Sequence, residues 1–193
     1  MGHLVVGHDF AFGRGRQGDT KWLKKETVSS GTEITVVEPL RSAGRVISSS
    51  LIRTYLKEGR LDRANELLGR FYHFDGIPEK GRGLGTKLGF PTVNLSVIQE
   101  KILPPGVHTA IIGAGNRTWP AVIYIGIRPT FFSEGKTVPE LNILCFSGKW
   151  TTGRTNVRLC GNIRKEKSFA SVIDLKKQIA NDISVAKKYF GLS

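Results

Sequence analysis

The sequence predicts a mainly β fold: a small antiparallel barrel or sandwich with one C-terminal helix, preceded by a fragment of α/β organisation. Between residues 71 and 159, short apolar runs alternate with Gly, Pro and Asn, at a spacing typical of antiparallel strands. Residues 171–190 repeat apolar side chains every three or four positions, which indicates an amphipathic helix. Before residue 70 the pattern differs, because strand-like runs there are separated by a helix-like one.

Residues 1–40 predict a strand, a long turn-rich segment, a short helix and a second strand. The runs are HLVV at residues 3–6, TKWLKKE at residues 20–26 and EITVVE at residues 33–38. Two strands and one helix cannot bury the core of a doubly wound domain. We therefore interpret this segment as an incomplete α/β unit.

Residues 48–68 predict two short amphipathic helices. A serine run supplies the N-cap of the first helix, Gly59 separates the helices, and Gly69 ends the second. We expect the domain boundary near residues 68–70, so that the first domain is 1–68 and the second is 69–193.

The second domain contains the strand-like runs and the long helix. Ser171 and Asp174 provide a start that resembles a capping box for this helix. Its apolar stripe is expected to pack on the sheet and consists of Val172, Leu175, Ile179, Ile183 and Ala186. The six strand-like runs lie at residues 72–77, 91–95, 106–112, 119–126, 140–146 and 155–163.

The composition of the 193 residues argues against several classes of protein. No apolar run is long enough to span a bilayer, and the N-terminus lacks the pattern of a secretory signal, so we expect a cytoplasmic protein without a membrane partner. The two cysteines cannot form a disulfide framework or a four-ligand metal site. Cys145 lies in the apolar run LNILCF, where a small buried side chain is expected.

The net charge of +13 first suggests a nucleic-acid partner. However, the basic residues are spread along the chain instead of forming one block, and such a spread also suits small polyanions such as nucleotides. A basic barrel that binds single-stranded nucleic acid remains the alternative from another functional class.

Gly13, Gly15 and Gly18 form a G-x-G-x-x-G pattern, and Glu38 follows at the distance of a dinucleotide-binding acid. In that motif the glycines follow the strand immediately, whereas here GHDFAF intervenes at residues 7–12. The dinucleotide interpretation is therefore weak.

A second glycine-rich stretch is a candidate cradle for phosphates. Backbone N–H groups at glycines can approach an anion closely, and Lys80, Arg82 and Lys87 add positive charge. The alternative is a flexible hairpin loop, and composition does not decide between the two. The glycines are Gly76, Gly81, Gly83, Gly85 and Gly89.

Two polar residues follow this stretch directly. Pro91 restricts the backbone, and in an extended segment Thr92 and Asn94 point to the same face. A hydroxyl and an amide oxygen are hard ligands that suit a Mg²⁺ ion already carrying phosphate oxygens.

Glu140 follows Pro139 and opens an apolar strand in VPELNILCF. A carboxylate at the mouth of a barrel could accept a proton from an attacking hydroxyl. The alternative is an exposed carboxylate at a strand end.

Four stretches in order, GRGLGTKLGFPTVNL, YIGIRPTF, PELNILCF and IRKEKSFASVIDLKKQI, resemble the bacterial riboflavin kinase domain. VVGHDFAFGRGRQGD and ISSSLIR resemble the C-terminal part of the FMN adenylyltransferase module that precedes it in bifunctional FAD synthetases. The resemblance covers essentially the whole chain. It implies a six-stranded antiparallel Greek-key barrel with a C-terminal helix, preceded by an incomplete nucleotidyltransferase remnant.

The resemblance implies transfer of the γ-phosphate of ATP to the 5′-hydroxyl of riboflavin, with Mg²⁺, to give FMN. The loop from Gly81 to Gly89, including Lys87, would cradle the ATP phosphates. Thr92 and Asn94 would hold the Mg²⁺, with Thr92 also binding ATP.

The resemblance also assigns the chemistry and the flavin site. Glu140 would be the catalytic base that activates the ribityl hydroxyl. Arg164, Lys167 and Phe169 match the segment that lines the flavin site.

The chain departs from the family pattern at several positions. Tyr124 stands where an Asn is usual, Cys145 where an acid is usual, Asn142 where a His or Tyr is common, and Thr152 where a Tyr is usual before Gly153. The departures at Tyr124 and Thr152 keep open a paralogue that binds flavin without phosphorylating it. The first half of the adenylyltransferase ATP site has no counterpart in the sequence, so we expect this chain not to convert FMN to FAD.

Overall fold

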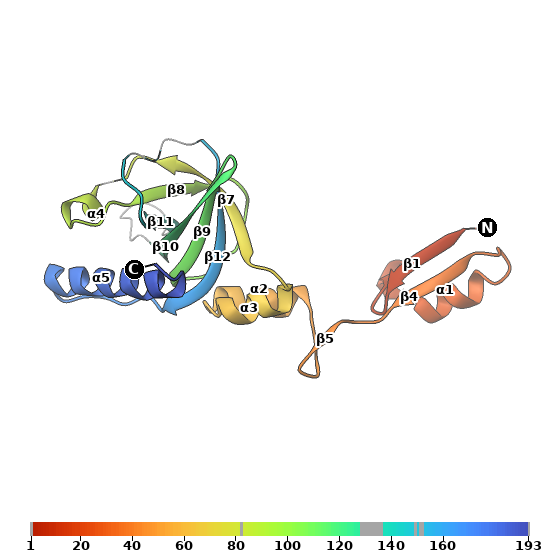
Figure 1. Ribbon diagram of the computed structural model, residues 1–193. Coiled ribbons are helices and arrows are strands. Elements are labelled where there is room, and N and C mark those ends of the chain that lie inside the picture. Colours follow the sequence, from red (N-terminus) through yellow and green to blue (C-terminus); the bar gives the residue numbers. More distant parts are fainter. Residues whose placement is uncertain (1, 82, 128–136, 149, 151–152, 193) are drawn as a thin grey trace. The chain divides into compact units, whose positions relative to one another are not determined.

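The computed structural model of the protein describes residues 2–81, 83–127, 137–148, 150 and 153–192. Thr152 and the residues 128–131 of YIGIRPTF lie outside the described residues. The chain divides into two compact units, Met1–Ser48 and Ser49–Ser193. Each unit is considered separately below (Figure 1).

The first unit has the predicted order of strand, turn-rich segment, helix and strand. β1 and β4 pair in parallel, with His3 opposite Glu33, and α1 is capped by the Asp19 carboxylate, which accepts a hydrogen bond from the Trp22 backbone N–H at 2.8 Å. The elements are β1 (His3–Gly7), β2 (Ala11–Phe12), the 3-10 helix η1 (Arg14–Arg16), β3 (Gly18–Asp19), α1 (Thr20–Glu26), β4 (Glu33–Val37), β5 (Arg41–Ser42) and β6 (Arg45–Val46).

This first unit buries little apolar surface. Among its described residues, Val6 is the one hydrophobic side chain that is fully buried. Val5 in the same strand is 56% exposed, Val37 in β4 is 51% exposed, and Trp22 in α1 is 47% exposed. The parallel strand pair therefore has apolar side chains that its own helix does not cover.

The second unit begins with α2 (Ser49–Lys57) and α3 (Leu61–Leu68), which pack on the barrel that follows. Leu56, Leu61 and Ala64 are buried in the same apolar cluster as the barrel interior. The Asn65 side chain donates to the Leu159 carbonyl at 3.0 Å and accepts from the Tyr72 N–H at 2.7 Å. The structural division at Ser48 thus lies earlier in the chain than the boundary expected near residues 68–70, because these helices share a core with the barrel.

Six strands form a closed antiparallel barrel in the order β10-β11-β8-β7-β12-β9. β9, β10 and β11 are consecutive neighbours, and β12 returns to lie beside β9, which is a Greek-key connection. The predicted fold class is confirmed. The strands are β7 (Tyr72–Glu79), β8 (Val93–Val97), β9 (Gly106–Ala114), β10 (Arg117–Ile127), β11 (Thr137–Ile143) and β12 (Thr155–Arg164), with the short helix α4 (Leu84–Lys87) between β7 and β8.

Alternate residues of each strand fill the barrel. Phe74, Ile123, Leu141 and Leu159 are completely buried inside it, so their neighbours along the strands face outward. A closed barrel also leaves no unpaired sheet edge among these strands.

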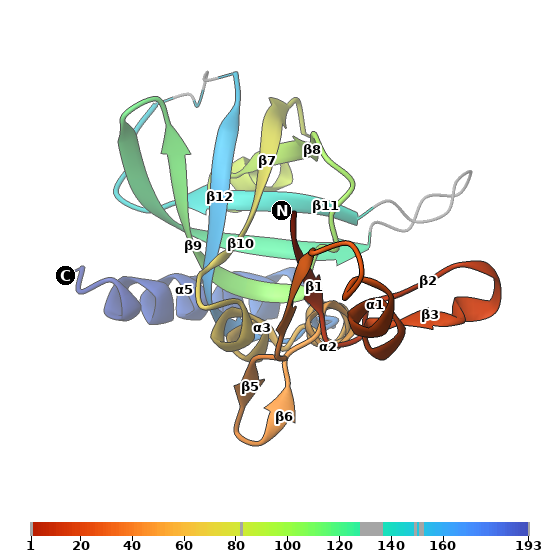
Figure 2. The ribbon, with the colours of Figure 1, turned by 90° about the vertical axis from the view of Figure 1, so that its right-hand side faces the viewer.

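Helix α5 (Val172–Tyr189) lies along the outside of the barrel (Figures 1 and 2). Ala186 is buried against Val107 and Val122 of the outer wall. The predicted N-cap is confirmed, since the Ser171 hydroxyl accepts from the Asp174 N–H at 3.1 Å. Val172 was expected in the apolar stripe, but it is 61% exposed at the first residue of the helix.

Two expectations about the run 140–146 were wrong. β11 starts at Thr137, so Glu140 lies in the middle of the strand and not at its opening. The strand ends at Ile143, and Cys145 follows in a turn with φ of 54° and an exposed side chain. The reason is the end of the pairing with β10, after which the chain turns away.

No helix in the described part of the chain is both long and apolar enough to cross a membrane.

Candidate functional site

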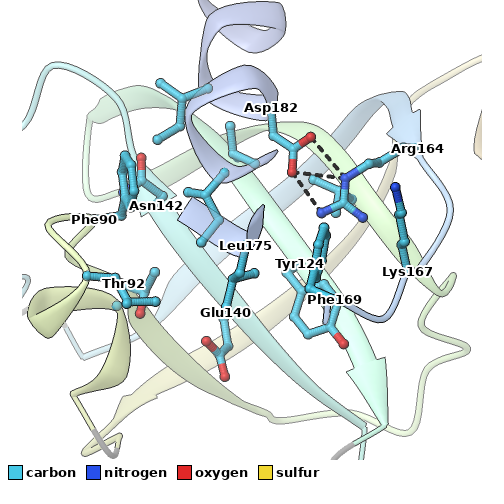
Figure 3. Close-up of a pocket in the computed structure, with 16 residues that line it drawn as sticks. Phe90, Thr92, Tyr124, Glu140, Asn142, Arg164, Lys167, Phe169, Leu175 and Asp182 are labelled. Carbon is cyan, nitrogen blue, oxygen red and sulfur yellow. Dashed lines mark hydrogen bonds and ion pairs between the residues drawn. The ribbon is translucent and has the colours of Figure 1, made fainter. Parts of the chain in front are cut away.

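A cavity of about 340 Å³ lies between the outer wall of the barrel and α5 (Figure 3). Its floor comes from outward-facing residues of β9, β10 and β11, and its roof from α5. At one end it is bounded by the segment before β8, and at the other by the segment after β12. The lining residues are Gly85, Leu88, Phe90, Thr92, Val107, Val122, Tyr124, Glu140, Asn142, Arg164, Lys167, Phe169, Leu175, Ile179, Asp182 and Ile183.

Strand register brings the polar residues of the floor together. Tyr124 of β10 is directly opposite Glu140 of β11, and Glu140 is directly opposite Asn94 of β8. Residues directly opposite each other in antiparallel strands have side chains on the same face. Leu141 and Leu95 point into the barrel, so the row Tyr124–Glu140–Asn94 faces outward.

The glycine-rich loop packs closely on Thr92 and Asn94. A Cβ atom added at Gly81 would collide with the Asn94 amide, and one added at Gly85 would lie 2.7 Å from Thr92 Oγ1. Asn94 is only 7% exposed beneath this loop. The glycines at these two positions therefore let the loop backbone reach the pair of predicted metal ligands.

A second cavity, of about 730 Å³, lies on the other side of Thr92. Lys80 and Thr86 line it from the loop side, and Phe146 and Trp150 line it from the segment after β11. The rings of Phe146 and Trp150 meet edge to face, with centroids 5.4 Å apart.

Thr92 and Asn142 line both cavities and form the partition between them. The Asn142 side chain donates to the Pro91 carbonyl at 2.9 Å, which fixes the backbone directly before Thr92. The partition is thus held on one side by Asn142 in a strand, and on the other by the segment that Pro91 restricts.

At the far end of the first cavity, Arg164 forms a charge pair with Asp182 of α5. Arg164 Nε lies 2.9 Å from Asp182 Oδ1, Arg164 Nη2 lies 2.9 Å from Oδ2, and Gln178 also donates to the same carboxylate. The guanidinium carbon lies 5.6 Å from the centre of the Phe169 ring, and Lys167 Nζ lies 5.8 Å from it. Arg164 therefore joins α5 to the barrel and offers the cavity a flat, charge-compensated face.

The Tyr124 hydroxyl donates to Glu166 Oε1 at 2.5 Å. Burial of the ring raises the pKa of Tyr124 strongly, and the hydrogen bond to Glu166 raises it further. The phenol therefore stays protonated and remains a donor at neutral pH.

The structure brings most of the predicted site residues together. Thr92, Glu140, Arg164, Lys167 and Phe169 all line the first cavity. The remaining predicted residues lie elsewhere: Asn94 is next to Glu140 under the loop, Gly81 covers Asn94, and Lys87 and Gly89 contribute to the lining of neither cavity.

Sequence reasoning missed Asp182 and Phe90, which line the first cavity. Asp182 could have been found, because it lies on the same helical face as Ile179 and Ala186, where an acid needs a buried partner. Within the described ranges, no cluster of three or more His, Cys, Asp or Glu side chains could hold a metal ion.

Comparisons with known proteins place both parts of the chain in known families. A family model described as riboflavin kinase matches residues 68–190, and one described as FAD synthetase matches residues 1–51. The chain is 33% identical over 185 residues to a bifunctional riboflavin kinase/FMN adenylyltransferase of Pseudomonas fluorescens, covering 96% of this chain and 60% of the relative. It is 35% identical over 191 residues to the protein of the same name from Escherichia coli strain K12, covering 98% and 61%.

Among solved structures, one titled as a macrolide-efflux protein from Streptococcus pneumoniae superposes with a TM-score of 0.83 at 26% identity. That match covers 95% of this chain and 60% of the other. The chain therefore spans about three fifths of the length of the relatives that it matches.

Proposed function

The chain belongs to the riboflavin kinase family, and from this membership we propose that it transfers the γ-phosphate of ATP to the 5′-hydroxyl of riboflavin, giving FMN and ADP. The observation that carries the proposal is the pair of cavities separated by Thr92 and Asn142, with Glu140 in the wall of the first cavity. Phosphoryl transfer needs two substrates positioned against each other, and charge neutralisation where they meet.

Riboflavin would occupy the cavity under α5. Its flat, apolar ring system suits a site lined by Val122, Leu175 and Ile179, with the Phe169 ring at the end that Arg164 closes. The ribityl chain would then run toward the partition, past Glu140.

ATP would occupy the larger cavity. Phe146 and Trp150 offer ring faces for an adenine base, and Lys80 offers a positive charge for the phosphates. The glycine-rich loop adds backbone N–H groups near Thr92.

The residues present fit a Mg²⁺ ion that is carried mainly by phosphate oxygens. Thr92 and Asn94 supply a hydroxyl and an amide oxygen next to the loop, and the described chain around them has no rich carboxylate cluster. Mg²⁺ typically uses few protein ligands at such sites and takes the others from substrate and water. When bound, it would neutralise charge on the triphosphate.

Glu140 would accept the proton of the attacking hydroxyl. It lies in the middle of β11, where strands on both sides hold the backbone, so the carboxylate is set on a rigid element.

The test is to incubate the chain with riboflavin and ATP, with and without Mg²⁺, and to identify the product by chromatography. We expect Mg²⁺-dependent FMN. Glu140→Gln should lower kcat by about 10²–10⁴-fold and leave riboflavin binding nearly unchanged, since it removes only the proton acceptor. Glu100→Gln, at an exposed position outside both cavities, is the matched control.

Failure to form FMN would refute the proposal. Riboflavin bound without turnover would instead support the alternative of a flavin-binding paralogue without kinase activity. Full turnover by the Glu140→Gln variant would assign the base to another residue.

A further inference from the structure

The hydrogen bond between Tyr124 and Glu166 joins two parts of the flavin cavity that are distant in sequence. Tyr124 is fixed in β10, whereas Glu166 lies in the segment 165–170, which has no regular secondary structure and connects β12 to α5. Lys167 and Phe169, which line the cavity, belong to this same segment.

The segment is anchored at both ends. At its start Arg164 is anchored by Asp182, and at its end Ser171 caps α5. Between these anchors, the hydrogen bonds described for the side chains of residues 165–170 include one to the barrel wall, the one from Tyr124. Arg164 of β12 also lies 5.6 Å from the centre of the Phe169 ring, so this contact joins Phe169 to the barrel, whereas the contact of Lys167 with Phe169 lies within the segment.

Gly126 of the barrel wall lies beside the hydrogen bond between Tyr124 and Glu166. A Cβ atom added at Gly126 would lie 2.7 Å from Glu166 Oε1 and would collide with the Tyr124 hydroxyl. Gly126 therefore leaves the space in which the phenol and the carboxylate meet.

We propose that Tyr124 and Glu166 form a latch that holds the segment 165–170 against the barrel and so positions Phe169 and Lys167 for the flavin. Tyr124 and Phe169 both line the cavity, and Figure 3 shows both side chains on the side away from Thr92. Glu166, which is not among the lining residues, is a positioning residue that acts through the segment, whereas Tyr124 both lines the cavity and holds Glu166. This inference rests on the proposed function, because it names riboflavin as the ligand.

The latch makes a selective prediction about kinetics. Tyr124→Phe and Glu166→Ala should each raise the KM for riboflavin by about three- to tenfold, the range for losing a charge-assisted hydrogen bond in a partly exposed position. The KM for ATP should stay within about twofold, because Tyr124 and Glu166 do not line the ATP cavity.

The double variant identifies the bond itself. Tyr124→Phe combined with Glu166→Ala should be no worse than either single change, because both remove the same interaction. Tyr189→Phe, which removes a hydroxyl from a half-exposed ring at the end of α5, and Glu100→Ala are the matched controls.

A readout without any ligand tests the latch independently of the kinase activity. Hydrogen exchange of the peptide containing residues 165–170 should be faster in both single variants than in the unsubstituted chain, while exchange in β10 is unchanged. The melting temperature should change little, since the barrel core is not touched.

The outcomes separate the two proposals. A riboflavin KM within twofold of the unsubstituted chain in both variants, equal effects on the KM for ATP, or additive effects in the double variant would each overturn the latch. If the unsubstituted chain does not phosphorylate riboflavin, the proposed function fails, and unchanged exchange at residues 165–170 would then overturn the latch as well.

Discussion

In residues 1–48 the parallel sheet consists of two strands, β1 and β4, whereas in residues 49–193 six strands close into a barrel. β-Branched residues in the middle of a strand differ in burial between the two sheets. Val5 in the middle of β1 is 56% exposed, and Ile123 in the middle of β10 is fully buried. The comparison shows that β-branched residues in a strand pattern become core only where a second layer or a closed barrel surrounds them.

Enzyme assays give the most decisive test of the difference between the two units. We expect the 193-residue chain to make FMN from riboflavin and ATP but to make no FAD from FMN and ATP. The two parallel strands and single helix α1 described for residues 1–48 cannot enclose a nucleotide. Chromatography of both reactions, with purified chain in catalytic amounts, checks this; steady formation of FAD would contradict it.

Matched core substitutions should give the next largest contrast. Phe74→Ala removes a fully buried ring from the barrel and should lower the free energy of unfolding of that unit by about 3–5 kcal/mol. Val5→Ala should cost less than about 1 kcal/mol, because half of its side chain is already in water. Urea unfolding followed by circular dichroism measures both; equal losses would show that β1 has a core of its own.

The ion pair under α5 should give a smaller effect. Asp182→Asn leaves Arg164 with an uncompensated charge at a site where the arginine side chain is only 20% exposed. We expect a loss of about 2–3 kcal/mol, below the usual cost of breaking a fully buried pair because solvent still reaches the guanidinium. The same unfolding measurement applies, and Arg63→Gln, which breaks the exposed pair with Glu66, is the control that should be nearly silent.

The smallest expected effect is on the pH dependence of stability. His108 lies inside the barrel with Nε2 donating to the Pro104 carbonyl, and burial lowers its pKa below the ordinary value of 6.5. The folded state therefore favours neutral His108. The contribution of this group to the free energy of unfolding is fully present above pH 6.5, and it is lost as the pH falls toward the lower pKa of the folded state. The contribution of His108 to the slope of the free energy of unfolding against pH should not exceed about 1.4 kcal/mol per pH unit. This slope should be smaller in His108→Leu. An identical pH profile for that variant would contradict the assignment.

Local patterns predicted most of the fold. The six apolar runs became six strands, Gly59 separates two helices with a left-handed φ of 69°, and Ser171 caps α5. The predictions that were wrong concern residues whose structure depends on pairing with strands distant in sequence. Cys145 looks like strand in the run LNILCF, but the strand ends where the pairing with β10 ends.

The candidate site was also predictable where one segment carried it. Thr92 and Asn94 lie two residues apart in one run, and Arg164, Lys167 and Phe169 lie in another. The residues that link segments were harder to predict. Asp182 acquires its role only when α5 packs beside Arg164, and Asn142 only when β11 places it against Pro91.

The partition made by Thr92 and Asn142 has a kinetic and stereochemical consequence. Because both side chains border both cavities, a donor in one cavity and an acceptor in the other would meet directly at the partition. On the proposed function, both substrates must therefore be present together, initial-rate lines should intersect as for a ternary complex, and a chiral phosphorus atom should be inverted by a single displacement.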